Sequence, residues 1–120
     1  MGTVANVAVG LVAALHLYFL VLEMFFWTRP LGRRVFGLTP EFAQASASLA
    51  ANQGLYNGFL AAGLIWGLTL GATGTSIKLF FLGCVIVAGL FGAATASRKI
   101  LWVQAVPGAV ALALVLLAGR

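Results

Sequence analysis

The feature that most constrains this chain is a series of four apolar stretches, each about twenty residues long. They cover residues 4–27, 49–70, 77–96 and 100–118. At 1.5 Å per residue, a helix of about 20 residues crosses the roughly 30 Å hydrocarbon core of a bilayer. Only 8% of the 120 residues are charged, against about 25% in soluble domains. The sequence therefore predicts an all-α integral membrane protein, a four-helix bundle forming one transmembrane domain over residues 1–120.

The basic residues lie mostly between these stretches. Three arginines separate the first stretch from the second, and Arg98 and Lys99 separate the third from the fourth. Because cytoplasmic loops are enriched in Lys and Arg, these two turns are expected to face the cytoplasm. The helices then run up and down, with both termini on the non-cytoplasmic side of the inner (plasma) membrane. Membrane lipid is the expected partner, and the net charge of +5 needs no nucleic acid.

Residues 28–48 connect the first two predicted spans. We expect residues 31–38 to form a basic loop. Thr39-Pro40-Glu41 is typical of a helix start, because threonine caps, proline suits the first helical position and glutamate favours the positive end of the helix dipole. A helix over residues 40–70 would be about 46 Å long, so its first turns are expected outside the hydrocarbon. Pro107 predicts a kink in the last span.

Ionisable side chains inside the predicted spans are the first candidate functional residues, because each is costly in lipid unless it has a partner. His16 and Glu23 are seven residues apart, which places them within about 20° of one face of the first helix. We expect His16 near the bilayer midplane and Glu23 about one turn from the cytoplasmic end. Both are predicted to be catalytic residues that transfer protons.

The second helix carries four polar side chains in an arc about 140° wide. They are Asn52, Gln53, Tyr56 and Asn57. Gly63 and Gly67 fall within the same arc, so this face is predicted to pack inward, where glycine allows a neighbouring helix close. Gly54 and Gly58 form a second small-residue pair on the opposite side, which makes them a candidate face for a homodimer.

Matching the depths of the first two helices brings Glu23 level with Asn52 and Gln53. Three further side chains are expected at the cytoplasmic end: Trp27, Trp102 and Gln104. Together with the four polar residues of the second helix, they are predicted to line a pocket for a small lipophilic or amphipathic ligand. The alternative for the tryptophans is interfacial anchoring.

Other interpretations of the polar groups stay open. They could hydrogen-bond to one another and fix helix order, at roughly 0.6 kcal/mol per contact. One histidine and one carboxylate fall short of the three or four ligands of a metal site, so no metal is predicted. A haem bound axially by His16 is a further alternative, and the sequence assigns no cofactor.

Three stretches carry a resemblance to a known family. They are LHLYFLVLEMF at 15–25, VFGLT at 35–39 and ANQGLYNG at 51–58. The chain resembles the small bacterial and fungal membrane proteins catalogued as domain of unknown function thirteen-oh-four. The resemblance implies four spans and supplies no activity.

Three classes of function compete. The first is a membrane protein that binds a ligand and transfers protons, with a residue set similar to that of sterol-isomerase-type bundles. The second is a proton-coupled carrier, which resembles small multidrug-resistance exporters in size and in having a membrane glutamate, here Glu23. The third is a subunit that packs on a partner through Gly54 and Gly58. Because a carrier needs access from both sides, a pocket confined to the cytoplasmic half favours binding, and whether the protein is an enzyme stays open.

Overall fold

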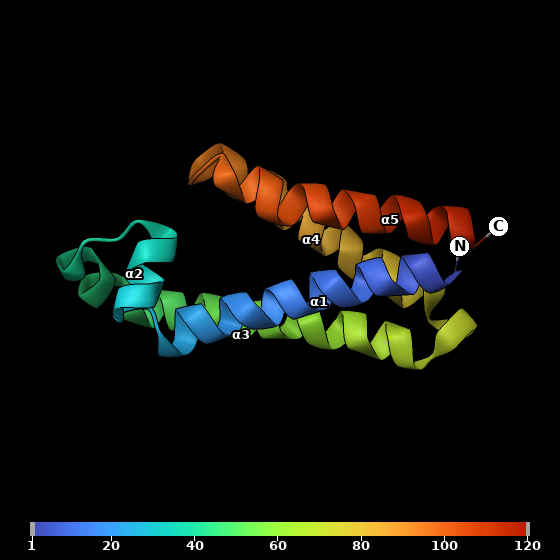
Figure 1. Ribbon diagram of the computed structural model, residues 1–120, viewed down its shortest axis with the longest axis horizontal. Helices are drawn as coiled ribbons and strands as arrows, with labels where there is room; N and C mark the ends of the chain where they lie inside the picture. The colour runs from blue at the N-terminus through green and yellow to red at the C-terminus, as the bar shows by residue number, and fades with distance from the viewer. Residues whose placement is uncertain (1, 120) are drawn as a thin grey trace. The chain divides into compact units, whose positions relative to one another are not determined.

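The computed structural model describes residues 2–119, and its regular structure in that range is entirely helical (Figure 1). In chain order the elements are α1 (Gly2–Phe25), α2 (Pro30–Phe36), α3 (Pro40–Thr69), the 3-10 turn η1 (Gly71–Gly74), α4 (Thr75–Thr95), the π turn η2 (Leu101–Ala105) and α5 (Val106–Ala118). The prediction of an all-α protein is confirmed.

Among the described residues, three helical segments are long and apolar enough to cross a membrane. They are Gly2–Phe25, Gly71–Thr95 and Leu101–Ala118. The 30-residue α3 is not among them. Its length is sufficient, but polar residues in its first half and middle lower its mean hydropathy, among them Ser46, Ser48, Asn52, Gln53 and Asn57. The three apolar segments therefore coincide with three of the four predicted spans.

The chain divides into two compact units, which are described separately. Unit 1 comprises Met1–Ala14 with Leu60–Arg120, and unit 2 comprises Leu15–Phe59. The core of unit 1 is formed by small and branched apolar residues from α1, α3, α4 and α5. They are Ala5, Val9, Val12, Ala13, Leu64, Leu82, Val85, Ala111 and Val115.

Glycines set the helix spacing inside unit 1. A Cβ atom on Gly63 would collide with the ring of Phe81, and one on Gly67 would lie 2.7 Å from Cγ of Lys78. Both contacts come from α4, so the prediction that these two glycines pack against another helix is confirmed. A Cβ on Gly89 would lie 2.6 Å from the backbone nitrogen of Ala105, which means that α4 and η2 touch through their backbones.

The predicted basic loop over residues 31–38 is wrong in part, because α2 occupies most of it. Pro30 stands in the first turn, where its missing N–H group costs no helical hydrogen bond. Gly37 ends the helix in the left-handed conformation, with φ 65° and ψ 42°, a conformation that favours glycine. The helix is too short for hydropathy to detect, but these two signals are present in the sequence.

The expected helix start at Thr39 is confirmed. The Thr39 hydroxyl accepts a hydrogen bond of 3.2 Å from the backbone N–H of Phe42, which satisfies one of the free donors at the start of α3. The irregularity expected at Pro107 takes the form of η2. There the N–H of Val106 donates to the carbonyl of Leu101, five residues back, and a wider turn of this kind makes room ahead of a proline ring.

Candidate functional site

A buried hydrogen bond between α1 and α3 is the centre of the candidate site in unit 2. The Asn57 side-chain amide donates to a carboxylate oxygen of Glu23 at 2.5 Å. Glu23 is 9% exposed and Asn57 is 5% exposed. A carboxylate in such surroundings needs a donor, because an unpaired buried charge is costly. The depth matching placed Glu23 level with Asn52 and Gln53, but its partner on α3 is Asn57, about one turn further along the helix.

The two helices approach closely here because Gly54 has no side chain. A Cβ atom at Gly54 would lie 2.7 Å from Cγ of Met24 and 3.1 Å from Cβ of Glu23. One at Gly58 would lie 2.7 Å from a methyl group of Leu20. Asn57 stands one turn from Gly54, so its amide faces α1 at the depth of Glu23. Gly54 and Gly58 therefore contact α1 within the chain, and the homodimer through them stays a prediction.

His16 is also buried, with 0% exposure. Its ring meets Phe19 edge to face, with centroids 5.7 Å apart. Seven residues along one helix separate it from Glu23 by about 10 Å. Direct proton transfer between the two side chains would therefore need an intermediate group.

Three of the four polar residues of α3 do not lie in the buried contact. Asn52, Gln53 and Tyr56 are exposed, and the Asn52 amide donates to the Tyr56 hydroxyl at 3.3 Å on the surface of α3. The expectation that the whole polar arc packs inward is wrong for these three. Gly54 instead lets α1 pack closely, and the buried residues on this face of α3 recur at three-, four- and seven-residue spacing. These residues are Ala43, Ala50, Gly54, Asn57 and Ala61.

Trp27 has a structural partner that the sequence analysis missed. Its ring N–H donates to the Ser46 hydroxyl at 3.0 Å, and that hydroxyl donates to the Phe42 carbonyl at 2.7 Å. The Trp27 ring also lies against Phe36, with centroids 4.9 Å apart. These contacts tie the end of α1 to α2 and α3. Nothing in the sequence identifies Ser46 as the partner of Trp27 except its place in the first turns of a long helix.

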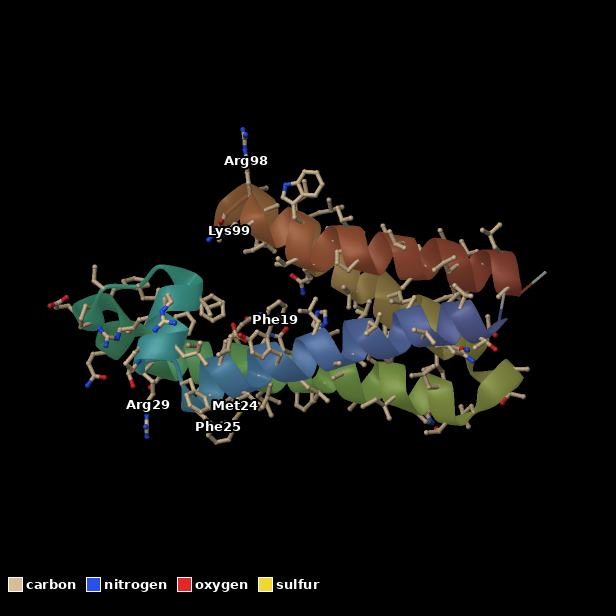
Figure 2. The ribbon with its side chains drawn as sticks, viewed as in Figure 1. Phe19, Met24, Phe25, Arg29, Arg98 and Lys99 are labelled. Atoms are coloured by element: carbon tan, nitrogen blue, oxygen red, sulfur yellow. The ribbon has the colours of Figure 1, made fainter. Side chains whose placement is uncertain are left out.

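The remaining predicted ligand residues belong to unit 1. Trp102 is 68% exposed, while Gln104 is half-buried, and both lie in η2. Figure 2 shows Arg98 extending away from the turn that precedes η2, and Arg29 extending away from the start of α2. Both arginines are exposed.

A second buried charge was missed by the sequence analysis. Lys78, in the first turns of α4, is only 6% exposed, and its ammonium donates to the Asn6 side-chain carbonyl at 3.1 Å. In the sequence it looks like a charge at the end of a span. Its burial follows from Gly67, which allows α3 to cover the lysine stem.

The fold and these buried polar groups define a class of protein: a small all-α chain with helices that could span a membrane and ionisable side chains placed between them. The chain belongs to the family described as protein of unknown function (DUF1304), which matches residues 10–116. It is similar to the uncharacterized protein YpaA of Lactococcus lactis subsp. lactis (strain IL1403), with 30% identity over 105 residues, which cover 85% of this chain and 88% of that protein. No solved structure matches the chain. The family resemblance read from the sequence is confirmed.

Proposed function

We propose that this chain is an inner-membrane protein of four spans that binds a small lipophilic or amphipathic ligand at the Glu23–Asn57 contact. In this proposal Glu23 exchanges a proton with the ligand, and His16 belongs to the same buried face of α1. The site lies in the cytoplasmic half of the membrane. The observation that carries the proposal is the buried Glu23–Asn57 hydrogen bond, because ionisable groups inside membrane spans are costly and mark functional sites.

The surfaces of the apolar helices support placement in a membrane. No more than 28% of the most apolar part of any of the three candidate spans is buried. Large apolar side chains are exposed along them, including Leu11 at 66%, Phe80 at 65% and Phe91 at 70%. Water disfavours so much contiguous apolar surface, whereas lipid tails accept it.

The order of the helices supports a fourth span through α3. The start of α1, the start of α4 and the end of α5 all line one pocket of unit 1, represented by Asn6, Thr75 and Ala118. Since α1 and α4 both begin at this end, the chain between them must return across the bundle. Among the intervening elements only α3 has the length, about 45 Å for its 30 residues. An even number of crossings also brings both chain ends to one side.

The neutral partner of Glu23 supports a role in binding. An amide satisfies a carboxylate oxygen without cancelling its charge, whereas a salt bridge would cancel it. The carboxylate has a second oxygen and several further acceptor positions. A ligand with an N–H or O–H donor or a cationic group can bind to the Glu23 carboxylate at these positions.

The test compares Glu23→Gln with Glu41→Gln, a matched change at the other glutamate, which is exposed in the first turn of α3. Each protein is extracted in a mild detergent and examined by native mass spectrometry. We expect wild type and Glu41→Gln to retain a bound species that Glu23→Gln has lost, with equal helix content by circular dichroism. A wild-type protein without bound species, or a folded Glu23→Gln that retains it fully, would refute the proposal.

A further inference from the structure

The second buried charge borders a cavity that the proposed function does not use. The cavity has a volume of about 420 Å³ and lies in unit 1 between the start of α1, η1, the start of α4 and the end of α5. This volume is within the roughly 300–1,000 Å³ of small-molecule sites. Lys78 and Asn6 are its main side chains with hydrogen-bond donors. Small residues line most of the remainder: Gly2, Ala5, Gly71, Ala72, Ala118 and Gly119.

No aspartate or glutamate side chain lies in the same unit as Lys78. The two acidic residues of the sequence, Glu23 and Glu41, both fall in unit 2. The ammonium of Lys78 donates to the neutral Asn6 side chain, and an ammonium group has three N–H donors. A charge that is 94% buried, as the 6% exposure implies, is favourable only where an opposite charge or further acceptors compensate for lost hydration.

The orientation of Asn6 adds donors to the same place. Because lysine only donates, the Asn6 atom that meets it is the carbonyl oxygen, and the amide nitrogen of the same group carries two N–H donors. The Thr75 hydroxyl donates to the carbonyl of Ala72 at 3.1 Å, which uses its proton within the wall. Thr75 is also the first residue of α4, and the positive end of a helix dipole favours anions.

We propose that this cavity binds the phosphate group of an anionic phospholipid headgroup, with the Lys78 ammonium as counter-charge and the Asn6 amide as a second donor. The choice of a lipid rests on the proposed membrane placement, in which the helix ends lie among the headgroups. Apolar lining by Val115 and a volume larger than a bare anion requires both favour a headgroup with its ester linkage. Free phosphate shares the oxyanion chemistry and is separated by the experiment.

The experiment measures the thermal unfolding midpoint of the full chain in an uncharged detergent. The additions are phosphatidylglycerol, phosphatidylcholine and inorganic phosphate at constant ionic strength. Phosphatidylglycerol should raise the midpoint of wild type by on the order of 5 °C. Phosphatidylcholine should raise it less, because its choline neutralises the phosphate charge.

Two variants remove the site in different ways. Lys78→Met keeps the stem and removes the charge, and Asn6→Asp keeps the lysine and supplies an internal carboxylate that competes with the phosphate. Both should unfold cooperatively and lose the phosphatidylglycerol shift, while the control Lys99→Met, a change at an exposed lysine, should retain it. A full shift with inorganic phosphate alone would support the oxyanion site with a free anion as its occupant.

The same shift in wild type and both variants, or no preference for phosphatidylglycerol over phosphatidylcholine, would overturn the proposal. Glu23→Gln should keep the full lipid shift. Failure of the Glu23 site and failure of the Lys78 site are therefore distinguishable in one set of measurements.

Discussion

At the scale of single residues, the buried side chains of Glu23 and Lys78 are each paired with one asparagine. Glu23 accepts from the amide nitrogen of Asn57, and Lys78 donates to the amide oxygen of Asn6. Asparagine offers both a donor and an acceptor, so it satisfies one atom of either charge. It does not cancel the charge itself. Neither contact is therefore an ion pair.

Asn57→Leu tests how much the buried amide contributes. The change removes the donor to Glu23, and we expect the free energy of unfolding to fall by about 1–3 kcal/mol, because a buried carboxylate oxygen is left unsatisfied. The matched control is Asn52→Leu, at an exposed position of the same helix, and it should change stability little. Thermal unfolding in detergent measures both. Equal effects of the two substitutions would mean that Asn57 is no more important than a surface amide.

At the scale of helices, side-chain size rather than polarity determines which face of α3 is buried beside α1. The cost of polar groups in lipid predicted correctly that Glu23 and His16 are buried. The same reasoning misplaced Asn52, Gln53 and Tyr56, because it assumed that every polar residue of the helix turns inward. The rotation of α3 is instead set by its alanines and glycines, which permit close packing. Sequence reasoning thus gave four amide and hydroxyl candidates but could not single out Asn57.

Gly89→Ala is the smallest substitution that tests backbone contact between α4 and η2. The added methyl group would lie 2.6 Å from the backbone nitrogen and 2.8 Å from Cα of Ala105, and backbone atoms yield less readily than side chains. We expect a loss of about 1–3 kcal/mol in unfolding free energy. Gly83→Ala is the control, since nothing lies within 4 Å of its Cβ position in the same helix. It should be neutral or stabilising by up to about 1 kcal/mol, because alanine favours helix.

If Gly89→Ala is as stable as Gly83→Ala in detergent unfolding, the two segments do not touch through their backbones. This comparison is informative because both glycines look alike in the sequence. Each lies within an apolar run, and nothing in the local residue pattern separates a contact position from an open one.

At the scale of the whole chain, hydropathy predicted three apolar helices well because their composition is nearly uniform. It was less decisive for α3, where the apolar part follows a polar half. In the proposed four-span arrangement, the exposed residues Asn52, Gln53 and Tyr56 place the hydrocarbon boundary on α3 further along the helix than residue 49. A fourth span then relies on helix order and length as much as on hydropathy.

The proposed topology rests on the direction of these helices and on the position of the basic residues, and cysteine labelling tests it. Gly2→Cys and Gly119→Cys are each introduced into a Cys84→Ala background. Removing the one native cysteine leaves only the introduced cysteine to be labelled. Because five of the seven basic residues lie in the two turns predicted to be cytoplasmic, we expect both new cysteines to react with an impermeant maleimide in intact cells.

Ser97→Cys, an exposed position beside Arg98, should react only after the membrane is permeabilised. It is a suitable control because it leaves every basic residue in place. Protection of positions 2 and 119 together with labelling of position 97 would invert the topology, and labelling of only one chain end would remove the fourth span.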